Sequence, residues 1–211
     1  MTDTKRAYQS PVRTQQAART RGRIVEAAAV LFSARGFGGT TMGDIARAAE
    51  VSVESVHATG WKAFLLVEAF RTRYLGQGGW ASVLEQDSVQ RIFAIDDAET
   101  ALDALEEFLV TAHGRSADLL MQLRSTAAVE PLVAESWAQL SRLKSESFLE
   151  TARWMIRIGI VRETVEDVAG LAATLNVVMS AETYLQMTRD WAMDEATYRA
   201  TMRAWMRSAR P

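Results

Sequence analysis

The chain has 211 residues, 48% hydrophobic and 24% charged, which is an ordinary globular balance and enough for a substantial core. It contains no cysteine and only two histidines, which excludes disulfides and thiol chemistry and disfavours a histidine-rich metal centre. No apolar run reaches the roughly 18 residues of a membrane span, and the N-terminus has no secretory signal. We therefore expect no membrane partner and a cytoplasmic location.

The net charge of −2 is unevenly distributed along the chain. Residues 1–62 contain nine basic and five acidic side chains, a balance of +4, so the remainder carries −6. A basic N-terminal part on an acidic body favours a polyanion partner at one end only, although a solvated basic tail gives the same pattern.

The first expected elements are three helices over residues 19–62, after a flexible basic arm over 1–18. Gly36 fits the end of the first helix, where Phe37 can fold back on Phe32. Thr41 and Asp44 form a capping-box pattern that predicts a short second helix, and Ser52 can cap a third through about residue 58. The apolar face of the first helix is formed by Ile24, Ala27, Ala28, Leu31 and Phe32.

Longer helices are expected in the remaining part, residues 63–211. The apolar spacing predicts helices over residues 64–74, 97–113, 119–127, 132–158, 165–188 and 194–208, with residues 80–96 left poorly defined. Only three prolines interrupt the chain, and no alternating strand pattern occurs. The sequence therefore predicts an all-α fold, with a three-helix N-terminal head and a larger helical body.

Two short helices joined by a tight turn form a helix-turn-helix. In this arrangement Ala46, Val51 and Val56 fill the angle between the helices, while the small polar side chains of residues 52–59 point away from the core. Because these side chains are short, the helix backbone can approach a groove. An ordinary surface helix does not explain so small an apolar face.

At these residues the chain resembles the TetR-type (tetracycline-repressor-like) family of bacterial transcription regulators, from about Arg19 to Leu66. Glu50 stands where the family usually has glycine, and His57 replaces a usual tyrosine. Residues 58–62 are one residue shorter than usual. The motif residues that carry the resemblance are Leu31, Phe32, Gly36, Phe37, Thr40, Thr41, Ile45, Ala46, Ala49, Val51, Ser52 and Lys62.

The resemblance implies binding of a double-stranded DNA operator. Val53 would touch a thymine methyl group; Glu54 would accept a hydrogen bond from cytosine or serve only as a charge at the helix start. His57 would contact a phosphate. The expected DNA-binding residues are Arg19, Arg21, Arg23, Thr40, Thr41, Ser52, Val53, Glu54, Ser55, His57 and Lys62.

The resemblance also implies that the body binds a small-molecule effector, which we expect to be apolar or amphipathic. Helical spacing alone assigns the large apolar side chains of the body equally well to core. The expected pocket residues are Phe70, Tyr74, Phe108, His113, Met121, Arg124, Trp137, Phe148 and Met155.

The last two expected helices carry apolar stripes that favour a homodimer, although the same residues could close the core of one chain. The expected interface residues are Leu175, Val178, Met179, Tyr198, Met202, Trp205 and Met206. We expect no enzymatic activity, cofactor or metal, since no nucleophile–base set or phosphate loop is recognisable. The alternative function is a protein-binding adaptor whose helix-turn-helix no longer binds DNA.

Overall fold

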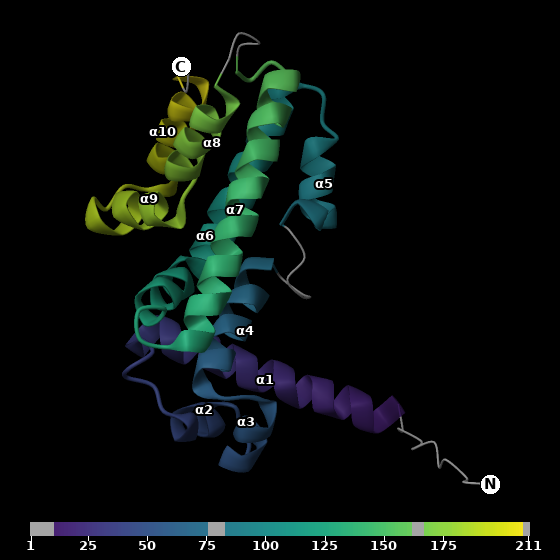
Figure 1. Ribbon diagram of the computed structural model, residues 1–211, viewed down its shortest axis with the longest axis vertical. Helices are drawn as coiled ribbons and strands as arrows, with labels where there is room; N and C mark the ends of the chain where they lie inside the picture. The colour runs from purple at the N-terminus through teal and green to yellow at the C-terminus, as the bar shows by residue number, and fades with distance from the viewer. Residues whose placement is uncertain (1–10, 76–82, 162–166, 209–211) are drawn as a thin grey trace, which may run out of the picture.

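A computed structural model describes residues 11–75, 83–161 and 167–208. Within these ranges the regular structure is helical without any strand (Figure 1), so the prediction of an all-α fold with an N-terminal helix-turn-helix head is confirmed. The head comprises α1 (Pro11–Arg35), α2 (Met42–Ala48) and α3 (Val53–Thr59), and α4 (Lys62–Leu75) leads into the body. Because α1 begins at Pro11, residues 11–18 are helical and not part of a flexible arm.

Local signals position the three head helices. Gly36 adopts φ +72° at the end of α1 and donates its N–H to the Phe32 carbonyl at 3.0 Å, and the Phe37 ring lies 5.7 Å from the Phe32 ring. Thr41 caps α2 in a reciprocal capping box with Asp44, and the Ser52 hydroxyl accepts the N–H of Ser55 at the start of α3. Each predicted helix boundary is thus satisfied by side chains within four residues of it.

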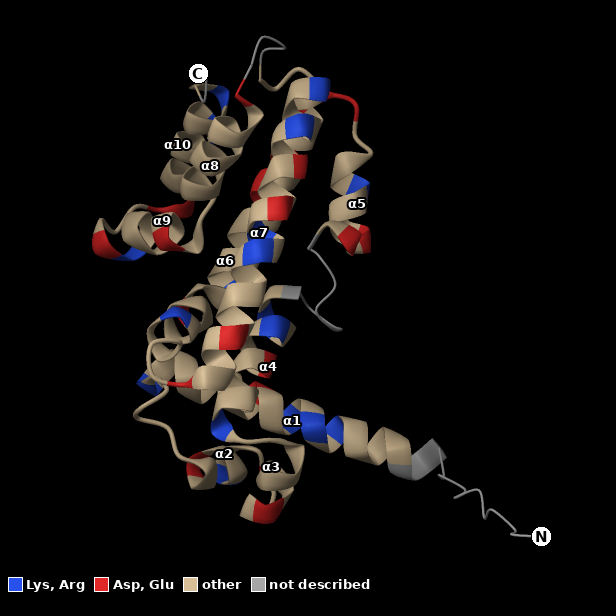
Figure 2. Cartoon of the chain, viewed as in Figure 1, with Lys and Arg blue, Asp and Glu red and all other residues tan. Residues whose placement is uncertain are grey.

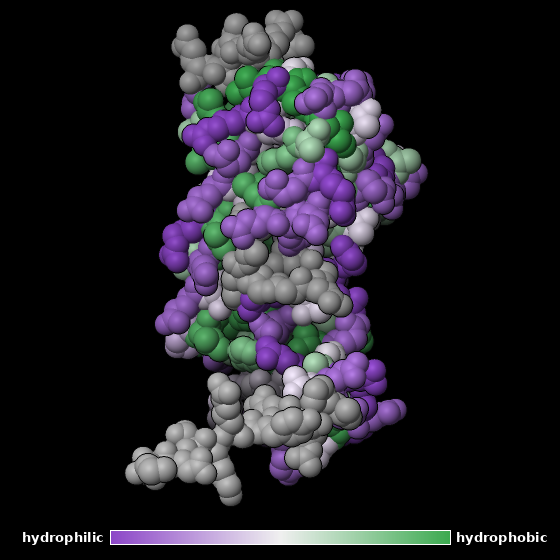
Figure 3. Space-filling view, turned by 90° about the vertical axis from the view of Figure 1, so that its right-hand side faces the viewer, coloured by the Kyte–Doolittle hydropathy of each residue, from purple (hydrophilic) through white to green (hydrophobic). Residues whose placement is uncertain are grey.

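The body is built on two long helices, α6 (Ala98–Thr126) and α7 (Pro131–Arg157), which run along the long axis of the molecule (Figure 1). On one side lie α8 (Val168–Val178), α9 (Ala181–Leu185), the π-helical turn η2 (Gln186–Asp190) and α10 (Glu195–Ser208). On the other side lie the short 3₁₀ helix η1 (Val83–Glu85) and α5 (Asp87–Phe93). On this second face polar side chains predominate, with scattered apolar groups between them (Figure 3).

Three expected boundaries in the body were wrong. Residues 97–113 and 119–127 form one helix, since Gly114 costs only about 1 kcal/mol inside a helix and the packed apolar face continues through it. Helix α5 was not predicted because seven residues give too weak a periodicity. The helix expected over 165–188 is interrupted at Ser180, whose extended backbone (ψ 155°) caps α9.

Two apolar clusters hold the chain together. The first joins the head to α4 and to the second half of α6, through Ile24, Ile45, Val56, Leu66 and Leu123. The second joins the first half of α6 to α7, α8 and α10. Continuous packing through α4 and α6 therefore connects the head to the body.

One stretch of the described chain, Val168–Asp190, is long and apolar enough to pass as a membrane span by composition. In the structure it is divided at Met179 and Ser180 between α8 and α9, and Leu171 and Leu175 pack into the second cluster.

Candidate functional site

Helix α3 is held by a narrow apolar edge and presents most of its side chains outward. Val56 is fully buried, whereas Ser52, Glu54 and His57 are exposed and Val53 is 39% exposed. Hydrogen bonds from its own backbone N–H and from Ser52 lower the pKa of Glu54, which is therefore a carboxylate at neutral pH. Helices α2 and α3 lie at one end of the molecule, away from α8 and α10 (Figure 1). The arrangement leaves α3 free to enter a groove.

Two of the expected DNA-binding arginines also brace the head. Arg21 pairs with Glu68 of α4 at 2.7 Å, and its guanidinium lies 5.7 Å from the Phe64 ring centre. Arg23 donates to the carbonyls of Ala49 and Glu50, the latter at 3.0 Å. Both side chains remain about half exposed, and Arg19 is exposed, so basic groups follow the middle of α1 (Figure 2).

Thr40 does not reach a DNA partner, which corrects its assignment from the sequence. Its side chain is buried and its hydroxyl donates to the Gly36 carbonyl at 2.9 Å, which ties the end of α1 to the loop that follows. Thr41 is exposed, but its hydroxyl accepts the Asp44 N–H and donates to the Asp44 carboxylate at 2.6 Å. The structure therefore gives Thr40 a purely internal role and makes Thr41 the cap of α2.

The junction between α3 and α4 presents an aromatic that the sequence analysis missed. Trp61 is 74% exposed and meets the His57 ring edge-on at 5.4 Å. Lys62 opens α4 with its ammonium 4.2 Å from the Phe37 ring centre, where partial burial lowers its pKa. Its position could have identified Trp61 from the sequence, because it lies between the reading helix and the lysine that begins the next helix.

Glu50 adopts φ +52°, the left-handed conformation for which glycine is usual, as the sequence comparison with the family implied. The two hydrogen bonds from Arg23 to this turn stabilise it from α1.

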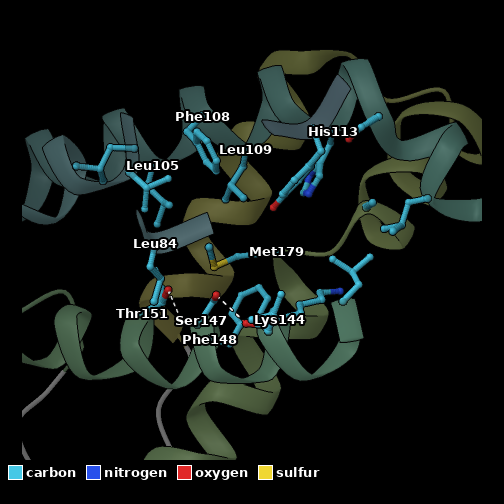
Figure 4. A pocket seen from close by; sticks show the side chains of 18 of the residues that line it. Leu84, Leu105, Phe108, Leu109, His113, Lys144, Ser147, Phe148, Thr151 and Met179 are labelled. Atoms are coloured by element: carbon cyan, nitrogen blue, oxygen red, sulfur yellow. Dashed lines mark hydrogen bonds between the residues drawn. The ribbon is translucent and has the colours of Figure 1, made fainter. Parts of the chain in front are cut away.

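A cavity of about 120 Å³ lies in the body between α4, α5, α6 and α7. A space of this kind needs only about 10–15 Å³ to hold one water, so it has room for a small organic molecule. Its lining is mostly apolar and includes the rings of Phe70, Tyr74 and Phe93. The rings of Phe108 and Phe148 lie on facing helices (Figure 4). Burial raises the pKa of Tyr74 to about 12, so its hydroxyl stays neutral.

Five of the nine expected pocket residues line this cavity, namely Phe70, Tyr74, Phe108, His113 and Phe148. The other four do not. Met121 and Trp137 pack against the first cluster and Met155 is fully buried in the second, while Arg124 is exposed and pairs with Glu182 at 3.0 Å. Helical spacing identified apolar faces correctly but could not distinguish packed residues from cavity residues.

Three polar residues that line the cavity lie on α7, and the sequence analysis missed all three. Lys144, Ser147 and Thr151 line it together with Leu140 and Phe148, all on one helical face. The serine and threonine hydroxyls donate to backbone carbonyls of the preceding turn at 2.8 Å, which leaves Lys144 as the charged group that α7 contributes. The spacing of these residues was visible in the sequence, but nothing in it showed that a space lies opposite.

The expected dimer stripe is largely internal. Leu175, Tyr198, Met202 and Met206 are fully buried within one chain, and Met179 lines the cavity. These five residues are not available for an interface, because α7 packs against α8 and α6 packs against α10 on this side. On the outer side, Trp205 is 42% exposed and Val178 half-buried, and Val177 and Trp191, which the sequence analysis did not select, are 65% and 72% exposed.

The described chain thus combines an exposed helix-turn-helix, a motif that binds DNA in other proteins, with a helical body that contains an internal cavity. Residues 24–58 match the family model of the bacterial regulatory proteins of the tetR family. The resemblance noted in the sequence is thus confirmed over the matched part of the head. No curated protein matches the sequence.

Solved structures share this fold over nearly the whole chain. A structure described as a transcriptional regulator from Saccharomonospora viridis in complex with choline has a TM-score of 0.69 and 20% identity, covering 90% of this chain and 96% of its own. A TetR-family regulator from Mesorhizobium loti has a TM-score of 0.67 and 18% identity, with 92% and 96% covered. A regulator from Pseudomonas aeruginosa has a TM-score of 0.61 and 13% identity, with 97% and 94% covered.

Proposed function

We propose that this protein is a cytoplasmic repressor that binds a near-palindromic DNA operator as a homodimer and is released by a small amphipathic ligand. The proposal rests on the exposure of α3. Val56 is its buried residue, and the polar face of the helix is exposed. One short helix reads few base pairs, so useful affinity calls for two heads about 34 Å apart, one turn of DNA.

Pairing of α8 and α10 from two chains would supply the second head. The exposed side chains Val177 and Trp205 lie on these helices, and a two-fold axis between them would form a four-helix bundle. Trp205 is the expected anchor, since large aromatics dominate the binding energy of interfaces.

Two helices connect the cavity to the head and support ligand coupling. Helix α4 lines the cavity through Phe70 and Tyr74, and its first residue, Lys62, lies over Phe37 in the head. Helix α6 lines the cavity through His113, and its Gln122 accepts the Phe37 N–H at 2.9 Å. A ligand that displaces either helix would therefore move the head, with a coupling of about 1–3 kcal/mol.

The central experiment measures binding of the full chain to DNA from upstream of its own gene, against a large excess of unrelated DNA, over a range of salt concentrations. Lys62→Ala is expected to weaken binding to all sequences and to shallow the salt slope by about one unit. Glu54→Ala should instead relax the preference at particular bases. Arg153→Ala, an exposed change on α7, is the matched control and should alter neither property.

Equal binding of the wild-type chain to operator and competitor DNA would refute the repressor function. Absence of any DNA binding would instead favour a protein-binding adaptor. The exposed carboxylates of Glu50 and Glu54 would then explain the loss, because they place negative charge where DNA phosphates would lie.

A further inference from the structure

The cavity in the body has an unbalanced charge. Among the described residues that line it, Arg71 and Lys144 are basic and none is aspartate or glutamate. The Arg71 guanidinium pairs with Glu68 at 2.6 Å, a carboxylate that also pairs with Arg21. Lys144 is thus the basic lining side chain for which no salt bridge to a described carboxylate exists.

Lys144 has no carboxylate within ion-pair distance in the described part of the chain. The nearest acidic influence on it is Glu182, whose carboxylate already pairs with Arg124 at 3.0 Å. The Lys144 ammonium lies 6.0 Å from the Phe148 ring centre, and partial burial lowers its pKa. A partly buried ammonium without a counter-ion is costly, and an anion brought in by a ligand would relieve that cost.

His113 provides a second polar group without a partner. It lies on α6, is 4% exposed, and its Nδ1 atom has no hydrogen-bond partner. Burial, and then the charge of Lys144, lower the pKa of His113 to about 4, so the ring is neutral at pH 7. A neutral imidazole can still donate one hydrogen bond.

These polar groups lie toward one end of the cavity. Figure 4 shows His113 on α6 and Lys144 on the facing α7, with Leu84 and Leu105 toward the other end. We infer that the cavity binds a small amphipathic carboxylate, with its anionic group between Lys144 and His113 and its apolar tail among Leu84, Leu105 and Phe108. The inference rests on the proposed function only in taking this cavity as the effector site.

A cationic ligand is disfavoured by the same geometry. The Saccharomonospora viridis structure of similar fold contains choline, a quaternary ammonium. Aromatic faces attract such cations, and this cavity has several, but Lys144 would place a like charge beside the ligand with no lining carboxylate to offset it.

The test is calorimetric titration of the full chain with three probes that share an eight-carbon tail: octanoate, octan-1-ol and octyltrimethylammonium. We expect octanoate to bind at least about tenfold more tightly than octan-1-ol, the scale of one charge-assisted hydrogen bond. Octyltrimethylammonium should bind more weakly than octan-1-ol.

Lys144→Met should abolish the preference for octanoate while octan-1-ol still binds as in the wild type, which shows that the cavity is intact. Arg142→Met removes an exposed charge two residues away on the same helix and should keep the preference. Lys144→Arg should also keep it.

Three results would each overturn the inference. Octanoate could bind no more tightly than octan-1-ol, the preference for octanoate could survive Lys144→Met, or none of the probes could bind. Octanoate that binds in a Lys144-dependent way but leaves DNA affinity unchanged would support the inference and refute only the ligand-release part of the proposed function.

Discussion

Replacing Arg203 with methionine is expected to destabilise the body severely. Arg203 lies on α10, and its Nε and Nη2 atoms donate to the two carboxylate oxygens of Glu106 on α6 at 2.6 and 2.8 Å. It also pairs with Asp103. The Glu106 side chain is only 6% exposed, whereas that of Arg203 is 27% exposed. Hydrogen bonds to Glu106 and then Asp103 raise the pKa of Arg203, so the arginine is always charged.

The magnitude follows from the burial of Glu106. Arg203→Met removes the partner of a nearly buried carboxylate, a change that typically costs about 3–5 kcal/mol because the remaining charge has lost its compensation. For a chain of this size each kcal/mol lowers the melting temperature by about 2–4 °C, so the midpoint should fall by about 6–20 °C. The hydrophobic contacts of α10 through Met202 and Met206 would remain.

Urea unfolding followed by far-ultraviolet circular dichroism measures the loss, with Arg207→Met as the control. Arg207 pairs with Glu99, but both side chains are well exposed, at 47% and 63%, so this change should cost at most about 1 kcal/mol. Arg203→Met combined with Glu106→Leu removes both charges and should recover most of the stability. A loss below 1 kcal/mol for Arg203→Met, or no recovery in the double variant, would refute the reasoning.

Three further predictions concern single positions. Glu50→Gly should raise the free energy of unfolding by about 0.5–1 kcal/mol, because glycine adopts φ +52° without strain. The change also removes the Arg23–Glu50 ion pair at 3.9 Å, but both side chains are well exposed, so that loss is small, and the hydrogen bonds from Arg23 to the turn carbonyls remain; a destabilised variant in urea titration would contradict this. Burial lowers the pKa of His113 to about 4, so below pH 6.5 the unfolded chain binds a proton at this residue more readily than the folded chain. The free energy of unfolding should therefore fall by roughly 3 kcal/mol as the pH falls from 6.5 to about 4. His113→Phe should flatten this part of the stability–pH curve, and an unchanged slope would refute the prediction. Trp205→Glu should convert the dimer into a monomer in light scattering at micromolar concentration, so a dimer that persists would place the interface elsewhere.

The helices of the head could be predicted from the sequence. Gly36, Thr41, Asp44 and Ser52 mark helix ends through contacts with residues at most four positions away, and such contacts are readable from spacing alone. The apolar face of α1 was equally clear because a period of 3.6 over several turns has one interpretation. The family pattern at these positions reflects the same local requirements, including the left-handed turn at Glu50.

The roles of the body residues depend on packing between distant helices and could not be predicted. Tyr198 and Met202 lie on an apolar stripe of α10 that the sequence assigned to a dimer, yet α6 and α8 of the same chain pack against it. Met155 became core and Phe148 became cavity lining, although both lie on α7 at helical spacing. Periodicity shows which face of a helix is apolar, but the partner that covers that face, or the space left beside it, depends on residues distant in the chain. The charge of the cavity was hidden for the same reason: no carboxylate in the described ranges forms an ion pair with Lys144, and Glu182, from another helix, pairs with Arg124 instead.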